Sequence, residues 1–389
     1  MAAAETQSRA RTRILSVEIL RVVSMLGIAV FHTFKPWFEQ LTTGDMANVH
    51  LPVDPLMLGS LMHPIPLLVL GFIDQLGAWG NHVFIMISGC FLLPRAIEYA
   101  SSDGADASQR QQTARRAKHI LFTVGLYAAC ALLVDTIYPD VTSASLESTT
   151  WLTQGLQFIW VYLVIVVACP LIARVWRHCR RPERLLAVAT LFVYAVNLYI
   201  AFVSPGSSER SLFEWRKIMS AVTYGLSFVI GGWIAMRCQE RSGKDKKSSL
   251  LVLLLSVTVT ILIEAYAALK GDLLLLDALS FKSTSLLACA MATTALAFAL
   301  SVPRELGAMH PRVSSLIAFS TSGMLGFYVL QSLFSYGWHT ISNDMLAQAL
   351  SFGVLPFLAA GLVFSVTLFL VLVTIDTFVR QPLFAWLHL

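Results

Sequence analysis

Hydrophobic residues occupy this chain in long runs that short polar segments separate. A helix needs about 20 apolar residues to cross the hydrocarbon core of a bilayer, and many runs reach that length. The pattern predicts an all-α, polytopic transmembrane bundle of about ten helices, at 14–34, 76–94, 119–138, 151–173, 185–203, 218–236, 249–268, 279–301, 316–338 and 350–375. No interval between them exceeds about 40 residues, so chemistry is expected within the bundle or its short loops.

Composition agrees with a membrane protein. The chain is 56% hydrophobic and only 13% charged, with a mean hydropathy of +0.69, whereas soluble domains carry roughly a quarter charged residues. The six cysteines form no C-x-x-C pair and are interpreted as small buried apolar residues. We therefore expect the chain to lie in a lipid bilayer and to bind no nucleic acid.

The distribution of basic residues predicts how the chain lies in the membrane. Of 28 Lys and Arg residues, 21 lie at the amino terminus, in the even-numbered connections and near the end of the chain, and six lie on the other side. The positive-inside rule then places both termini in the cytoplasm. We expect a cytoplasmic segment at 1–13, a membrane domain at 14–380 and a cytoplasmic tail at 381–389. A long external loop is expected at 35–75 and a cytoplasmic linker at 98–113.

The first predicted helix contains three ionisable residues, which are costly inside a bilayer and suggest a function. At about 100° per residue, Glu18, Arg21 and His32 share one stripe. Glu18 and Arg21 can form an ion pair, and His32 lies roughly 16 Å further along the axis. In the alternative interpretation, Glu18 and Arg21 mark the inner membrane surface and His32 marks the outer one.

The second predicted helix has a polar row of its own, in which Asp74, Asn81 and Ser88 recur every seven residues. Small residues that permit close approach to neighbouring helices accompany it, namely Gly77, Gly80 and Gly89. This row is either a hydrogen-bonded seam between helices or one wall of a polar cavity.

Basic residues cluster where the third predicted helix begins, at Arg115, Arg116 and Lys118. A helix amino terminus favours anions, so the cluster predicts a phosphate site, although cytoplasmic topology would explain the cluster unaided. Glu264 in the seventh helix is a further buried charge with no assignable partner. No P-loop, H-E-x-x-H or G-x-S-x-G motif occurs, and no metal site is predicted.

Five stretches together resemble the membrane proteins known as acyltransferase family 3. The signature of that family is an acid, an arginine, ten residues and a histidine on the first helix, which here is VEILRVVSMLGIAVFH. The other stretches follow in the order of the family, namely VFIMISGCFLL (83–93), RRAK (115–118), QFIWVYLVIVVACPLI (157–172, with Trp160, Tyr162 and Pro170) and FYVLQSLF (327–334). Lys118 and Gln331 depart from the arginine and histidine that are common in the family.

The resemblance implies transfer of an acyl group, usually acetyl from cytoplasmic acetyl-CoA, to a hydroxyl of an external carbohydrate or glycolipid. It implies no bound cofactor, since acyl-CoA is a donor substrate. O-acetylation during exopolysaccharide biosynthesis and a multi-pass location in a cell membrane, the bacterial cytoplasmic membrane, are the corresponding expectations.

The resemblance also implies roles for individual residues. His32 is expected to be the general base, because imidazole titrates near pH 6.5, with Arg21 and Glu18 as its catalytic companions. The expected donor-binding residues are Arg115, Arg116 and Lys118. The residues expected to line the cavity are Asn81, Ser88, Trp160 and Tyr162.

Two other functions are compatible with buried charges in a membrane bundle. A transporter or flippase of a polysaccharide precursor would line its substrate path with such charges, but it tends to show internal repeats, and none is evident here. A membrane sensor is a weaker alternative, because the sequence shows no recognisable signalling domain.

Overall fold

The computed structural model describes residues 14–42, 51, 55–100, 106–203, 212–240, 246–280, 284–302 and 310–387. All regular elements in these ranges are helices. The long ones are α2 (Leu15–Thr42), α4 (Pro64–Tyr99), α5 (Asp106–Ile137), α6 (Gln157–His178), α7 (Pro182–Leu198), α8 (Leu212–Glu240), α9 (Lys246–Lys270) and α15 (Val354–Trp386). The shorter ones are α3 (Pro55–Gly59), η1 (Ser60–Met62), η2 (Trp151–Gly155), η3 (Tyr199–Val203), α10 (Leu273–Ser280), α11 (Leu286–Ser301), α12 (Pro311–Ser322), α13 (Met324–Leu333) and α14 (Ser335–Leu350).

The helices account for the predicted membrane spans. Eight of them are long and apolar enough to cross a bilayer, and α12 with α13, which meet at a bend of 47°, can form a ninth span. The shorter apolar helix α11 covers most of the remaining predicted range, 279–301. The all-α, polytopic transmembrane bundle is therefore confirmed, whereas the cytoplasmic location of both termini stays a prediction.

Several helices are longer than their apolar runs. Helix α2 continues to Thr42, and α4 begins at Pro64 and has 36 residues, so most of the described residues in the predicted loop 35–75 are helical. Similarly, α5 begins inside the predicted linker 98–113, and α15 runs through most of the predicted tail 381–389. Hydropathy predicts the part of a helix that crosses hydrocarbon, whereas packing against neighbours decides where the helix ends.

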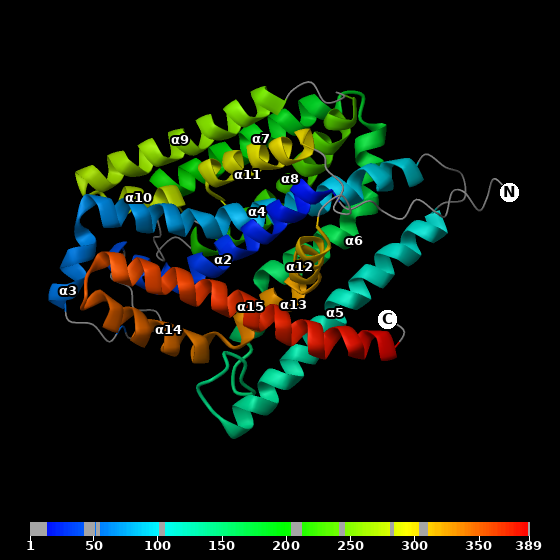
Figure 1. The fold of residues 1–389 in the computed structure, drawn as a ribbon. Coiled ribbons are helices and arrows are strands. Elements are labelled where there is room, and N and C mark those ends of the chain that lie inside the picture. Colours follow the sequence, from blue (N-terminus) through cyan, green and yellow to red (C-terminus); the bar gives the residue numbers. More distant parts are fainter. Residues whose placement is uncertain are drawn as a thin grey trace.

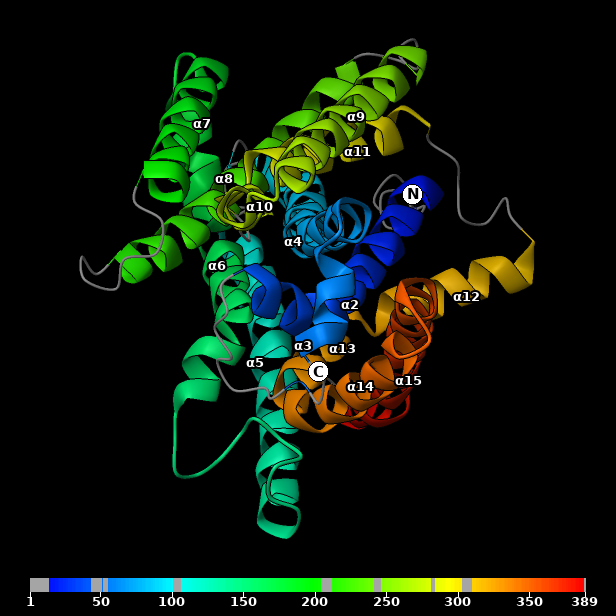
Figure 2. The same cartoon turned by 90° about the vertical axis from the view of Figure 1, so that its left-hand side faces the viewer.

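Helices α2 and α4 lie at the centre of the bundle in both views (Figures 1 and 2). Helix α4 packs against α2, α6, α8, α9 and α11. Glycines make this possible, because a Cβ atom on Gly89 would lie 1.9 Å from the Phe228 carbonyl oxygen of α8. A Cβ on Gly77 would lie 2.4 Å from the Phe31 ring of α2. The predicted close approach at these glycines is confirmed.

The outer helices present apolar side chains to their surroundings. On α7, Leu191 and Phe192 are strongly exposed, and on α9 the same holds for Leu251 and Leu262. Exposed apolar rows of this kind are the surface that lipid covers in a membrane protein.

Candidate active site

The predicted ion pair on the first helix is present. Glu18 lies in the first turn of α2, where the helix dipole favours a carboxylate, and Nη1 of Arg21 lies 3.2 Å from its Oε2 atom. The Glu18 side chain is 7% exposed and that of Arg21 is 23% exposed. This pairing reduces the cost of keeping both charges inside the bundle.

His32 lies three turns beyond Arg21 on the same continuous helix. Its side chain is half-buried, and its ring contacts the edge of the Phe31 ring, with centroids 4.8 Å apart. One turn further, Nζ of Lys35 forms an ion pair with Glu39 at 2.8 Å. The helical repeat places Arg21, His32, Lys35 and Glu39 on one face, so the polar stripe extends beyond the three residues that the sequence indicated.

Titratable residues from other helices lie near this end of the stripe. Asp74 of α4 interacts electrostatically with Lys35 and Glu39. Three further residues belong to the same group. Asp277 of α10 interacts electrostatically with Asp74, and Arg216 of α8 interacts with Asp277. His339 of α14 interacts with Lys35. We call these six residues the Lys35 cluster. Five helices thus supply titratable groups to the Lys35 cluster, which begins one turn beyond His32 on α2, and only the tertiary structure reveals this.

Asn81 and Ser88, which the sequence proposed as cavity-lining, face two different helices. The Tyr328 hydroxyl of α13 donates a hydrogen bond to Oδ1 of Asn81 at 3.3 Å. The Ser88 hydroxyl donates to the Tyr162 hydroxyl of α6 at 3.4 Å. These contacts place Asn81, Ser88 and Tyr162 around one junction of α4, α6 and α13.

Aromatic rings fill that junction. Phe158 of α6 stacks on Tyr328 with centroids 4.6 Å apart, and Phe84 of α4 contacts the Tyr162 ring at 5.2 Å. Trp160 lies apart from the group, because its Nε1 donates to the Leu152 carbonyl oxygen at 2.7 Å. The structure therefore brings together three of the four residues that were expected to line a cavity.

The basic cluster lies on α5, with Arg115 and Lys118 exposed and Arg116 half-buried. Helix α5 begins at Asp106, more than two turns before Arg115. The prediction that this cluster marks a helix amino terminus is therefore wrong, since the dipole effect is confined to the first turn. Any anion site here depends on the basic side chains alone.

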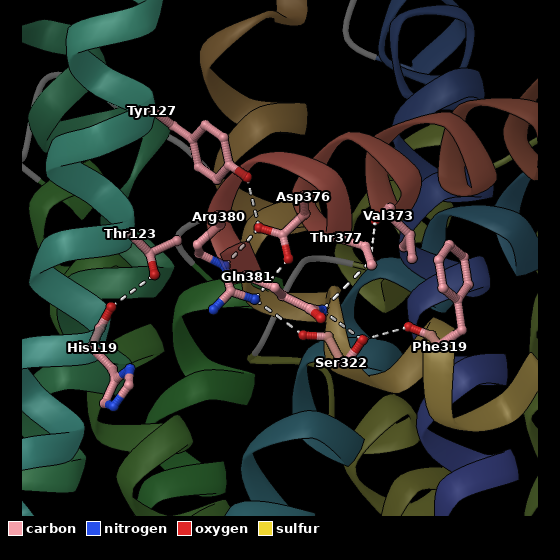
Figure 3. Close-up of polar contacts among 10 residues, drawn as sticks. All are labelled: His119, Thr123, Tyr127, Phe319, Ser322, Val373, Asp376, Thr377, Arg380 and Gln381. Atoms are coloured by element: carbon pink, nitrogen blue, oxygen red, sulfur yellow. Dashed lines mark hydrogen bonds and ion pairs between the residues drawn. The ribbon is translucent and has the colours of Figure 1, made fainter. Parts of the chain in front are cut away.

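A buried network that the sequence did not indicate lies where α5 meets α15 (Figure 3). Asp376 of α15 is fully buried, and Arg380 donates to its two carboxylate oxygens at 2.7 and 2.6 Å. The Tyr127 hydroxyl of α5 donates to the same carboxylate at 2.8 Å. Asp376 was missed because it follows the predicted end of the last span, although its i,i+4 spacing to Arg380 is typical of a helical ion pair.

The structure also assigns a partner to Glu264. The Gln75 amide of α4 donates to its Oε1 atom at 2.7 Å, and both side chains are fully buried. Oε2 of Glu264 and Oε1 of Gln75 have no hydrogen-bond partner among the described residues. Glu264 therefore joins α9 to α4.

Within the part of the chain that the structure describes, no three His, Cys, Asp or Glu residues are placed to hold a metal ion. The family model described as "Acyltransferase domain" matches residues 14–375, nearly the whole chain. No curated protein matches the chain, and no solved structure matches it either.

Proposed function

The chain belongs to the acyltransferase family 3, and on that premise we propose that it is a membrane O-acyltransferase that acts on a carbohydrate. The donor is acyl-CoA on the cytoplasmic side, with acetyl as the group transferred. The acceptor is a hydroxyl of an extracytoplasmic polysaccharide or its lipid-linked precursor. The observation that supports this proposal is the face of α2, which carries the Glu18–Arg21 ion pair and His32 at the spacing of the family.

In the proposed reaction, the acceptor hydroxyl oxygen attacks the thioester carbonyl carbon, and His32 takes the hydroxyl proton. The carbon–sulfur bond then breaks, and the CoA thiolate leaves and is protonated. A general base is needed because a protonated sugar hydroxyl is a poor nucleophile. The half-buried position of His32 suits this role, since its ring remains within reach of a substrate.

Arg21 has a different role in the proposal. It lies roughly 16 Å from His32 along the helix axis, so the two side chains do not contact the same reacting atoms. A fixed cation inside the bundle typically lines a path for a polar substrate. We assign Arg21 to the path of the donor chain toward His32, with Glu18 holding its guanidinium in place.

The donor-binding residues in the proposal are Arg115, Arg116 and Lys118. CoA is polyanionic at its adenosine phosphate end, and basic side chains on α5 are complementary to it. Hydrogen bonds to charged groups contribute roughly 1.5–3 kcal/mol each. The acceptor approaches from the opposite end of α2, where the polar and charged side chains of the Lys35 cluster suit a ligand with many hydroxyl groups.

The experiment uses the purified chain in lipid nanodiscs with acetyl-CoA and surface polysaccharide from the host. Acceptor-dependent release of CoA and acetylation of the glycan, followed by mass spectrometry, are the readouts. His32→Ala should lower turnover by roughly 10²–10⁴, the usual contribution of a positioned base. The matched control is His63→Ala, which removes an exposed histidine at the start of α4 and should leave turnover unchanged.

Two results would contradict the proposal. Wild-type protein that neither releases CoA nor acylates any acceptor, but moves a glycan precursor across the bilayer, would favour the transporter alternative. Near wild-type turnover in folded His32→Ala protein would exclude His32 as the base.

A further inference from the structure

Arg380 is held in one orientation by partners from two helices, α15 and α12. Its Nε and Nη2 atoms donate to Asp376, one turn earlier on α15, and Nη2 also donates to the Ser322 carbonyl oxygen at the end of α12, at 3.1 Å. Tyr127 of α5 donates to Asp376 and completes the arrangement. Figure 3 shows the carboxylate of Asp376 between the Tyr127 hydroxyl and the Arg380 guanidinium.

One end of the guanidinium remains available for a ligand. Nη1 of Arg380 makes no hydrogen bond or ion pair with any residue that the structure describes. In Figure 3 this nitrogen points away from the carboxylate, and the Arg380 side chain keeps 11% exposure. Since the other two nitrogens are fixed, Nη1 is a donor whose direction the protein sets in advance.

Arg380 lies beside the basic part of α5. Its guanidinium is 5.2 Å from the centre of the Phe384 ring, and the His119 ring packs against the same Phe384 at 5.2 Å. Arg115, one turn before His119, and Arg380 both interact electrostatically with His119. Arg380 of α15 and Arg115 of α5 therefore border one region, although they are far apart in the chain.

The charges in this region do not balance. Arg115 and Arg380 both act on His119, and Arg116 and Lys118 follow Arg115 within one turn of α5, whereas the carboxylate that pairs with Arg380 is Asp376. Asp376 is fully buried behind Arg380, so it stabilises the guanidinium without blocking its outer edge. A surplus of positive charge with one preoriented arginine is the arrangement that recognises phosphate groups.

We propose that Arg380 is a further donor-binding residue, which contacts a phosphate of acyl-CoA through Nη1 while Asp376 and Tyr127 hold its guanidinium. This inference rests on the proposed function, because it takes acyl-CoA as the donor. It extends the donor site from α5 to α15, and it gives the buried Asp376 the role of a positioning residue.

The test compares two donors that share the reacting thioester and differ in phosphates. Acetyl-CoA carries the adenosine phosphates, whereas acetyl-pantetheine does not. Removing Arg380 alone would leave Asp376 buried and unpaired, so the test variant is Asp376→Asn with Arg380→Gln. We expect its KM for acetyl-CoA to rise about tenfold or more, as loss of one charged hydrogen bond predicts, and its KM for acetyl-pantetheine to stay unchanged.

The matched control removes another ion pair of similar length. Arg237 of α8 pairs with Glu183 of α7 at 2.6 Å, and both side chains are well exposed. Glu183→Gln with Arg237→Gln should leave the KM for both donors unchanged. Binding of adenosine 3′,5′-bisphosphate to each protein, measured by calorimetry, gives a readout that does not require turnover, and it should weaken only in the Asp376/Arg380 variant.

An equal rise in the KM for both donors, or an unchanged affinity of the double variant for the bisphosphate, would overturn the inference. Either result would show that Arg380 only holds α12 and α15 together. If the double variant does not fold, Arg380→Lys is tested with the same two donors and the bisphosphate, and the same outcomes apply. Lysine keeps the charge but loses the fixed geometry of the guanidinium. Wild-type protein that uses neither donor would contradict the proposed function itself, which separates the two failures.

Discussion

Nη1 of Arg21 donates to both carboxylate oxygens of Glu18, at 3.2 Å in each case. The pair lies within a single turn of α2, so it needs no other helix to form. Its surroundings decide its energetic importance, because the Glu18 side chain is almost completely buried and Arg21 is only 23% exposed. Loss of either partner therefore leaves a charge in an apolar environment.

We expect Arg21→Gln to destabilise the protein, because Glu18 would stay buried without its cation. Breaking a fully buried pair costs about 3–5 kcal/mol, and the cost here is smaller because Arg21 is partly exposed. The double variant Glu18→Gln with Arg21→Gln should recover the thermal stability, measured by unfolding in detergent, but not the acyl transfer. Full activity in that stable double variant would remove the pair from the proposed mechanism.

Gly89→Ala should disrupt the crossing of α4 and α8. A Cβ at this position would lie 1.9 Å from the Phe228 carbonyl oxygen, so the backbones must separate, at a cost of typically 1–3 kcal/mol. Gly125→Ala on α5 is the control, because nothing lies within 4 Å of its Cβ position. Alanine there should be neutral or stabilising by up to about 1 kcal/mol, and a similar loss at both sites would argue against the observed crossing.

Gln75→Leu should destabilise the packing of α4 on α9, because Glu264 would keep its buried carboxyl group without a donor. An unsatisfied buried polar group costs about 1–3 kcal/mol, more if it is charged. Replacing both partners, by Gln75→Leu with Glu264→Leu, should restore most of the stability, since neither polar group then remains. A double-mutant cycle of melting temperatures checks this, and additive losses would show that the two residues do not interact.

The orientation in the membrane is tested by labelling single cysteines in a variant whose six native cysteines are replaced. Reporters at Glu147 and Asp272 should react with an impermeant maleimide from outside intact cells, whereas reporters at Ser108 and Arg180 should react only after permeabilisation. All four positions are exposed, so access depends on the side of the membrane. The reverse pattern would show that the topology is inverted. The basic cluster of α5 would then lie on the outer side of the membrane, away from the proposed cytoplasmic donor.

Much of the architecture could be predicted from the sequence, because the required information is local. Apolar runs of membrane-spanning length indicate helices whatever the rest of the chain does. The shared face of Glu18, Arg21 and His32 follows from the helical repeat alone. The resemblance to a family, confirmed by the match over residues 14–375, likewise depends on residues read in order along the chain.

The ends of the helices could not be predicted in the same way. Hydropathy ended the last span at 375, yet α15 continues to Trp386. Phe384, in the part of α15 beyond residue 375, is 6% exposed and packs against Phe122 of α5. This contact stabilises helical turns that hydropathy alone does not predict. The missed Asp376 and Arg380 lie in the same extension.

The sequence by itself thus determined the class of protein, the helices and the polar residues that share one face of α2. The tertiary structure decided which polar groups meet across the bundle. Tyr127 and Asp376 are 249 residues apart, and Gln75 and Glu264 are 189 apart, so neither pairing follows from periodicity. Helices in a bilayer bury few polar groups, and each must find a partner, but the partner is chosen by how the helices pack.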